Sequence, residues 1–88
     1  MDLSTVLSRN PEAAFRIYDG QATVVLPGRS EINVLNEIGS LIWERIDGEH
    51  TVGQILEAVL DAYDIDSEKA RLDMFDFLSS LREHGMVT

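Results

Sequence analysis

The sequence contains no cysteine, so disulfide bonds and thiolate metal sites are excluded and nothing marks an oxidising compartment. It has only two histidines, His50 in an expected turn between helices and His84 at an expected helix end. The sequence gives no reason for these two side chains to meet. We therefore interpret both as solvated surface residues and expect no metal site.

Basic residues are also scarce. Seven lysines and arginines stand against sixteen aspartates and glutamates, which gives a formal net charge of −9. A charge of this sign repels the phosphate backbone that supplies most of the affinity for nucleic acids. We therefore expect no nucleic-acid partner.

The sequence lacks a long apolar run, and its first residues lack the basic and then apolar layout of a secretory signal. These absences predict a cytoplasmic protein with no membrane partner. The chain has 88 residues, of which 44% are hydrophobic and 26% charged, as is typical of a folded domain. A chain of this length forms one core and leaves little room for an enclosed active site, so its size favours binding over catalysis.

Motifs for catalysis are missing too. The acidic residues Asp61, Asp64, Asp66 and Glu68 suggest calcium binding, but no register places glycine and glutamate where a calcium-binding loop needs them. The sequence has neither a phosphate-binding glycine loop nor a nucleophile elbow. We expect no catalytic residues and no cofactor, and we predict that the protein is not an enzyme.

What is present is a regular series of short elements. Residues 1–12 show no sustained period, and we interpret them as a flexible arm before a domain over 13–88. Alternating apolar and polar residues then predict three strands, over 14–18, 22–26 and 31–35, separated by turn pairs. These strands form an antiparallel meander in which the first and third are edges.

From Asn36 onward the apolar residues follow a helical period, which predicts three helices. Their boundaries carry residues suited to capping or to ending a helix, namely Asn36 and Asp47-Gly48, Thr51 with Gln54, and Asp66 or Ser67 with Gly85. Three strands followed by three helices predict an α+β domain with a winged helix-turn-helix fold. Trp43 lies beside the main stripe of the first helix, so we expect it at the edge of the core with its indole N–H near solvent.

Two features point to binding. The third strand has a free edge over Arg29 to Leu35, and the third helix carries Phe75 on a flank beside Arg71, Leu78 and Arg82. Leu72 points further outward. Such a flank beside a free strand edge is suited to an extended peptide, although the same pattern is also that of an ordinary helix border.

The sequence resembles the PqqD family, named for the pyrroloquinoline quinone biosynthesis protein D. The similarity is carried by two runs, the segment Val34-Leu35-Asn36-Glu37-Ile38-Gly39-Ser40-Leu41-Ile42-Trp43-Glu44-Arg45-Ile46-Asp47-Gly48 and the segment Asp73-Met74-Phe75-Asp76-Phe77-Leu78 with Leu81 and Gly85-Met86-Val87. Members of this family, also called RiPP recognition elements, are peptide chaperones. They bind the leader of a ribosomally made precursor peptide and present it to a modifying enzyme.

In that family the leader adds a strand to the third strand and contacts the third helix. The resemblance therefore implies a peptide-binding site formed by Arg29, Glu31, Ile32, Asn33, Val34, Leu35, Arg71, Leu72, Phe75, Leu78, Ser79 and Arg82. The implied partners are a precursor peptide and a modifying enzyme, such as a radical SAM maturase or a leader peptidase.

Residues 25–31 differ from the hairpin of the members that act in pyrroloquinoline quinone synthesis. The product is therefore either that cofactor or another peptide, such as a lasso or radical-SAM-modified peptide. Two other functions are compatible with the fold, a DNA-binding regulator and a module that dimerises through the edge of the third strand. Acidic residues on the third helix, among them Asp73 and Asp76, disfavour the regulator.

Overall fold

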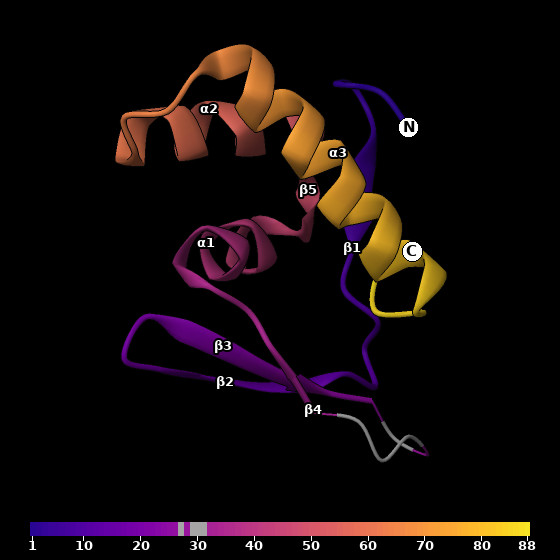
Figure 1. The fold of residues 1–88 in the computed structure, drawn as a ribbon. Helices are drawn as coiled ribbons and strands as arrows, with labels where there is room; N and C mark the ends of the chain where they lie inside the picture. The colour runs from indigo at the N-terminus through magenta and orange to yellow at the C-terminus, as the bar shows by residue number, and fades with distance from the viewer. Residues whose placement is uncertain (27, 29–31) are drawn as a thin grey trace.

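The computed structural model describes residues 1–26, 28 and 32–88. In Figure 1 a three-stranded sheet forms one side of the molecule, α1 packs on it, and α2 and α3 lie beyond α1. The elements in chain order are β1 (Val6–Ser8), β2 (Ala14–Tyr18), β3 (Gln21–Val25), β4 (Ile32–Val34), α1 (Glu37–Arg45), β5 (Asp47–Thr51), α2 (Val52–Ala62) and α3 (Ser67–Glu83). This arrangement confirms the predicted α+β class.

The three-stranded sheet has the order β2-β3-β4, and both pairings are antiparallel. Asp19 and Gly20 connect β2 to β3, and both have positive φ angles, 54° and 78°. Two consecutive residues with positive φ angles form a two-residue turn whose backbone twist matches that of the two strands it connects. The predicted meander is therefore confirmed over the described residues, and Glu31, the expected start of the third strand, lies outside them.

The helix caps predicted from the sequence are also present. The Asn36 side chain accepts a hydrogen bond from Gly39 N at 2.7 Å, and Thr51 and Gln54 form a capping box at the start of α2. Asp66 caps α3 by accepting from Lys69 N at 2.9 Å. Because these caps satisfy backbone donors at each helix start, they fix where α1 and α3 begin relative to the sheet.

A buried serine fastens α1 to the sheet. The Ser40 hydroxyl accepts a hydrogen bond from Ala22 N of β3 at 2.6 Å and donates to the Leu35 carbonyl oxygen at 3.3 Å. Ser40 is almost fully buried, and a buried hydroxyl without partners would cost free energy. The hydroxyl therefore bridges β3 and the residue that follows β4, and it holds the end of β4 in place.

A second sheet was not foreseen. Within the expected arm 1–12, β1 pairs antiparallel with β5, and Leu7 is only 1% exposed. Ser8 also exchanges backbone hydrogen bonds with Thr88, at 3.2 and 2.9 Å. A strand of three residues with one buried side chain is too short to show a period. The first part of the arm is therefore attached to the body of the protein instead of being loose.

The expected position of Trp43 was wrong. Its side chain is 0% exposed, and its indole Nε1 has no hydrogen-bond partner among the described residues. Phe15 contacts it edge to face, with ring centroids 5.6 Å apart, and the Arg9 guanidinium lies 5.9 Å from its ring. The sequence did not indicate that the segment around Arg9 would fold back and cover this tryptophan.

In the part of the chain that the structure describes, no helix is both long and apolar enough to cross a membrane.

From the turn at the start of β5 we predict how acidic pH changes the stability of the fold. Backbone N–H groups of His50 and Glu49 donate to the Asp47 carboxylate, at 3.0 and 2.9 Å, and lower its pKa from 3.8 to about 2. Because the pKa is lower in the folded state, this carboxylate stabilises the fold above about pH 4, and the contribution is lost as the pH falls toward about 2. We expect carbon NMR to show the Asp47 carboxyl titrating near pH 2, and a midpoint near 3.8 would contradict the turn geometry.

Candidate functional site

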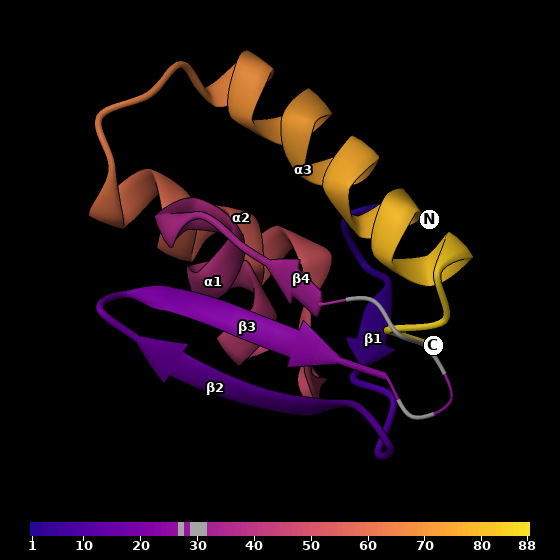
Figure 2. The same ribbon diagram turned by 60° about the horizontal axis from the view of Figure 1, so that its bottom comes forward.

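The outer edge of β4 carries no strand in the described part of the chain. β4 pairs with β3 on one side, and β1, the strand nearest the N-terminus, pairs with β5 instead. In Figure 2 β3 lies on one side of β4, and α3 lies beyond its other side. The described segments of this chain therefore leave the edge between β4 and α3 open.

The hydrogen-bonding pattern shows which atoms face that edge. Leu35 N donates to Ala22 O at 2.8 Å, so Leu35 directs its N–H toward β3. Along an antiparallel strand this direction alternates with every residue. Asn33, the partner of Val24, therefore also faces β3. Ile32 and Val34 direct their N–H and C=O groups away from β3, toward the open edge.

The side chains of β4 divide in the same way. Asn33 is opposite the buried Val24 and points to the core side of the sheet, where it is half-buried. Ile32 and Val34 are 68% and 63% exposed on the other face. Leu35 is buried in the core, and its N–H and C=O groups bond to Ala22 O and to the Ser40 hydroxyl, so Leu35 offers no free hydrogen-bonding group to a guest. Arg29, also expected in this site, lies outside the described residues.

The position of α3 beside this edge is fixed by Phe77. A Cβ atom added at Gly39 would lie 3.2 Å from Phe77 Cζ and 3.5 Å from Leu35 Cβ. Phe77 therefore packs where β4 leads into α1, and the absence of a side chain at Gly39 permits this contact. The flank of α3 that lies against the start of α1, next to the end of β4, is the one that carries Phe77.

Phe75 lies on a different flank. At about 100° per residue, two positions along a helix place it about 160° from Phe77. Its side chain is half-buried and packs against the core cluster. By the same geometry, Asp73, Ser80 and His84 share the flank of Phe77, within about 60° of it.

The other helix residues expected in the site have varied surroundings. Leu78 is fully buried, and Leu72 is 53% exposed. Arg71 Nη2 donates to Glu68 Oε1 at 2.7 Å within the same helix, and Ser79 and Arg82 are exposed. Arg71, Leu72, Phe75, Ser79 and Arg82 lie between about 100° and 160° from Phe77 on the opposite flank. The structure thus brings Phe77, and not this group, to the end of β4.

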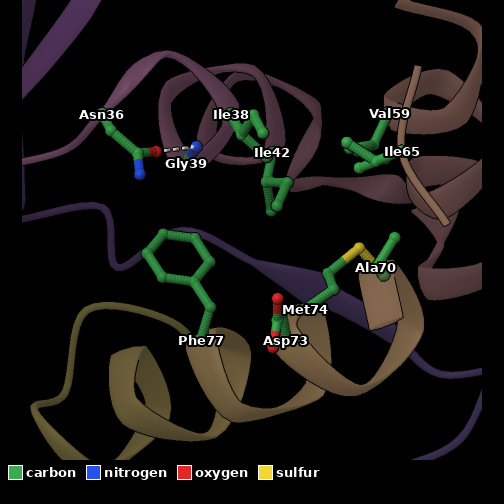
Figure 3. Close-up of a pocket in the computed structure, with 10 residues that line it drawn as sticks. All are labelled: Asn36, Ile38, Gly39, Ile42, Val59, Ile65, Ala70, Asp73, Met74 and Phe77. Carbon is green, nitrogen blue, oxygen red and sulfur yellow. Dashed lines mark hydrogen bonds between the residues drawn. The ribbon is translucent and has the colours of Figure 1, made fainter. Parts of the chain in front are cut away.

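A cavity of about 220 Å³ opens between α1, α2 and α3, at the end of the molecule to which β4 leads. Figure 3 shows the side chains that line it, with Asn36 and Phe77 at one end and Val59 and Ile65 at the other. Asn36, Asp73 and Phe77 are part of this lining. Sequence reasoning missed Asp73 and Phe77 as candidates, because only the folded helix shows which flank faces β4.

The chemistry available here is that of binding. The edge offers main-chain donors and acceptors, beside it Ile32 and Val34 expose apolar side chains, and the nearby flank of α3 carries Phe77 together with the polar residues Asp73, Ser80 and His84. No group of three or more potential metal ligands comes together within residues 1–26, 28 and 32–88. His50 pairs with Asp47 at 2.7 Å in the turn of β5, and His84 Nδ1 lies 2.8 Å from the Ser80 carbonyl oxygen at the end of α3.

Residues 22–87 match the family model described as Coenzyme PQQ synthesis protein D (PqqD). The chain belongs to the PqqD family. This match covers the three elements that form the candidate site, namely β4, α3 and the start of α1 between them. The family predicted from the sequence is therefore confirmed.

Two solved structures have the same fold as this PqqD-family chain. One is TbiB1 in complex with the TbiA(beta) leader peptide, with 19% sequence identity, a TM-score of 0.82, and coverage of 91% of this chain and 93% of that one. The other is lasso peptide synthetase B1 complexed with the leader peptide, with 21% identity, a TM-score of 0.82, and coverage of 96% and 99%. A search of curated proteins returned no match. The fold class predicted from the sequence is therefore also that of these two solved proteins, and each similarity extends over at least 91% of both chains.

Proposed function

We propose that this protein binds the leader of a ribosomally made precursor peptide by adding the leader as a strand to the outer edge of β4. The open edge is the observation that carries the proposal, because a strand with unpaired N–H and C=O groups accepts an extended chain through main-chain hydrogen bonds. The two proteins of similar fold were both solved with a leader peptide, which supports the same class of ligand here.

The guest would pair with the main chain of Ile32 and Val34 on one side, whereas Asn33 and Leu35 direct their N–H groups toward β3. Its other side would face α3, where we propose that Phe77, with Asp73 and Ser80, replaces the Phe75 flank as the helix wall. Phe77 supports this assignment because it alone of the two aromatic residues packs against the junction of β4 and α1. Leu78 then serves as a core residue beneath the site.

The role that fits these features is that of a cytoplasmic chaperone and not an enzyme. Main-chain pairing holds a peptide without altering its bonds, so a separate enzyme would carry out the modification. The fold is shared with lasso peptide synthetase B1, which favours a lasso or related peptide over pyrroloquinoline quinone as the product. The partner enzyme would be a leader peptidase or a radical SAM maturase.

Amide hydrogen exchange tests this function at the level of single residues. In the free protein, the N–H groups of Ile32 and Val34 should exchange quickly, and that of Asn33 should be protected by β3. Adding the leader encoded beside this gene should protect Ile32 and Val34 and leave Asn33 unchanged. Protection of Ile32 and Val34 without peptide, rising with protein concentration, would instead show that the edge pairs with a second copy.

A further inference from the structure

The sheet has a second edge, which the proposed leader site does not use. β2 pairs with β3 on one side, and in the described part of the chain no strand pairs with its other side. In Figure 2 β2 forms the border of the sheet opposite β4, with β3 between them. A guest strand on β4 would therefore leave the edge of β2 free.

The hydrogen bonds of β3 show which groups of β2 face this second edge. Ala22 O accepts a hydrogen bond from Leu35 N, so the main-chain groups of Ala22 face β4. Along β3 the direction alternates with every residue, so the next residue faces β2, where its partner is Arg16. The main-chain groups of Arg16 therefore face β3. Its neighbours Phe15 and Ile17 direct their N–H and C=O groups to the outer edge.

The edge of β2 lacks the features that keep sheet edges from pairing. β2 has five residues and pairs with β3 in unbroken register, so no bulge bends it. It contains neither proline nor lysine, and Phe15 and Ile17 are 37% and 43% exposed. Proteins normally protect an exposed edge by a bulge, a proline, a charged residue that points inward or a covering segment. An edge without such protection is suited to pairing with another chain.

Two arginines give this edge a positive charge. Arg16 is at the centre of β2 and points away from the core, because Phe15 beside it lies opposite the buried Val24. The Arg9 guanidinium lies over the Phe15 ring on the core side, 4.8 Å from the ring centroid. Among the described residues, neither arginine forms an ion pair with a carboxylate. Because opposite charges directly across a strand pair stabilise it, the edge favours a guest strand with an acidic residue opposite Arg16.

A second copy of this chain fits the edge less well. The antiparallel self-pairing that uses all the outward groups of β2 places Phe15 of one copy opposite Ile17 of the other. It therefore also places Arg16 opposite Arg16. Like charges directly across a strand pair destabilise it, and each copy carries a net charge of −9. A strand of another protein, with acidic and apolar residues in alternation, avoids both costs.

We propose that the modifying enzyme adds a strand of its own to the outer edge of β2, with an acidic residue opposite Arg16 and apolar residues beside Phe15 and Ile17. This inference rests on the proposed function and extends it, because a chaperone that presents a leader contacts the leader and the enzyme at the same time. With the leader on β4 and the enzyme on β2, β3 lies between the two guests. Neither guest has to leave before the other binds.

Amide hydrogen exchange with both partners tests this assignment. The enzyme encoded beside this gene, a leader peptidase or a radical SAM maturase, is added with and without saturating leader. We expect the enzyme to protect the amides of Phe15 and Ile17 and to leave that of Arg16 unchanged, since β3 already protects it. The leader should protect none of these three amides and should not displace the enzyme. Protection of Phe15 and Ile17 without enzyme, rising with protein concentration, would assign the edge to a second copy and overturn the proposal.

Arg16→Glu tests the charge of the partner strand. Binding of the enzyme, followed by biolayer interferometry, should weaken by roughly 2- to 30-fold, because an attractive pair across the strands becomes a repulsive one. Arg82→Glu is the matched control, since it changes the net charge equally at an exposed position on α3, beyond α1 from the sheet (Figure 1). It should change enzyme binding by less than about twofold. Thermal unfolding checks that both variants fold, and unchanged enzyme binding by Arg16→Glu would contradict the acidic partner.

The failure of this inference differs from failure of the proposed function. If the enzyme protects neither Phe15 nor Ile17, or if the leader displaces the enzyme, the assignment of β2 is wrong. Protection of the Ile32 and Val34 amides by the leader would then still support strand addition at β4. If the leader protects neither of these amides, the proposed function fails, and protection of Phe15 and Ile17 by the enzyme still reports on β2 alone.

Discussion

Val34→Pro should weaken binding of the leader by about tenfold or more and leave the protein folded. Val34 directs its N–H away from β3, so proline removes a donor that only the guest would use. One main-chain hydrogen bond contributes about 0.5 to 1.5 kcal/mol net, and the proline ring also obstructs the approaching strand. Isothermal titration with the leader measures the loss, and thermal unfolding measures stability.

Asn33→Pro is the matched control, one residue away on the same strand. Its N–H faces Val24 of β3, so proline here breaks the internal ladder and leaves the Val24 carbonyl without its partner. We expect the fold to lose about 1 to 3 kcal/mol, which thermal unfolding would detect. If Val34→Pro unfolds the protein as much as Asn33→Pro does, the alternation deduced for β4 is wrong. If both variants stay folded and bind normally, the edge of β4 is not the site.

Ser80→Trp should weaken leader binding by about tenfold, and Ser79→Trp should change it by less than about twofold. Both serines are exposed and adjacent on α3. Ser80 lies about 60° from Phe77, on the flank that faces β4, whereas Ser79 lies about 40° from Phe75. A bulky indole blocks the guest only on the flank that the guest contacts, and the titration that compares these two variants therefore identifies that flank.

The serine pair separates binding from folding better than the aromatic residues do. Phe77→Ala would remove a half-buried ring that packs at Gly39, and such losses lower stability as well as affinity. Serine and tryptophan have similar helix propensities, so both variants should unfold at nearly the same temperature as the unmodified protein. The reverse result, in which only Ser79→Trp blocks binding, would restore the Phe75 flank as the helix wall.

Most of the fold was predictable because it follows from local patterns. The Asp19-Gly20 turn fixes the hairpin by its backbone conformation, and Asn36 and the Thr51 capping box mark helix starts through hydrogen bonds a few residues away. Signals of this kind lie within the segment that they shape. The sequence therefore predicted β2, β3 and the three helices without knowledge of how they pack.

The remainder depends on contacts between distant residues. β1 is defined by pairing with β5, whose Thr51 lies opposite Val6 and whose Asp47 lies opposite Ser8, and Trp43 is covered by Arg9 and Phe15. The direction of the α3 flanks belongs to the same class, because the helical period separates Phe75 from Phe77 but does not show which of them lies against Gly39. The order of the strands along the sequence predicted the free strand edge of the candidate site. It did not predict which flank of α3 lies beside that edge.

The buried hydrogen bonds of Ser40 affect how quickly the protein binds its guest peptide. Its hydroxyl fixes one end of the receiving strand before any encounter, so less conformational entropy is lost at that end on association. A preorganised receptor of this kind does not wait for a rearrangement, which favours fast association. Loosening this bridge, as Ser40→Ala would, should slow capture even though Ser40 itself is too deeply buried to touch the peptide.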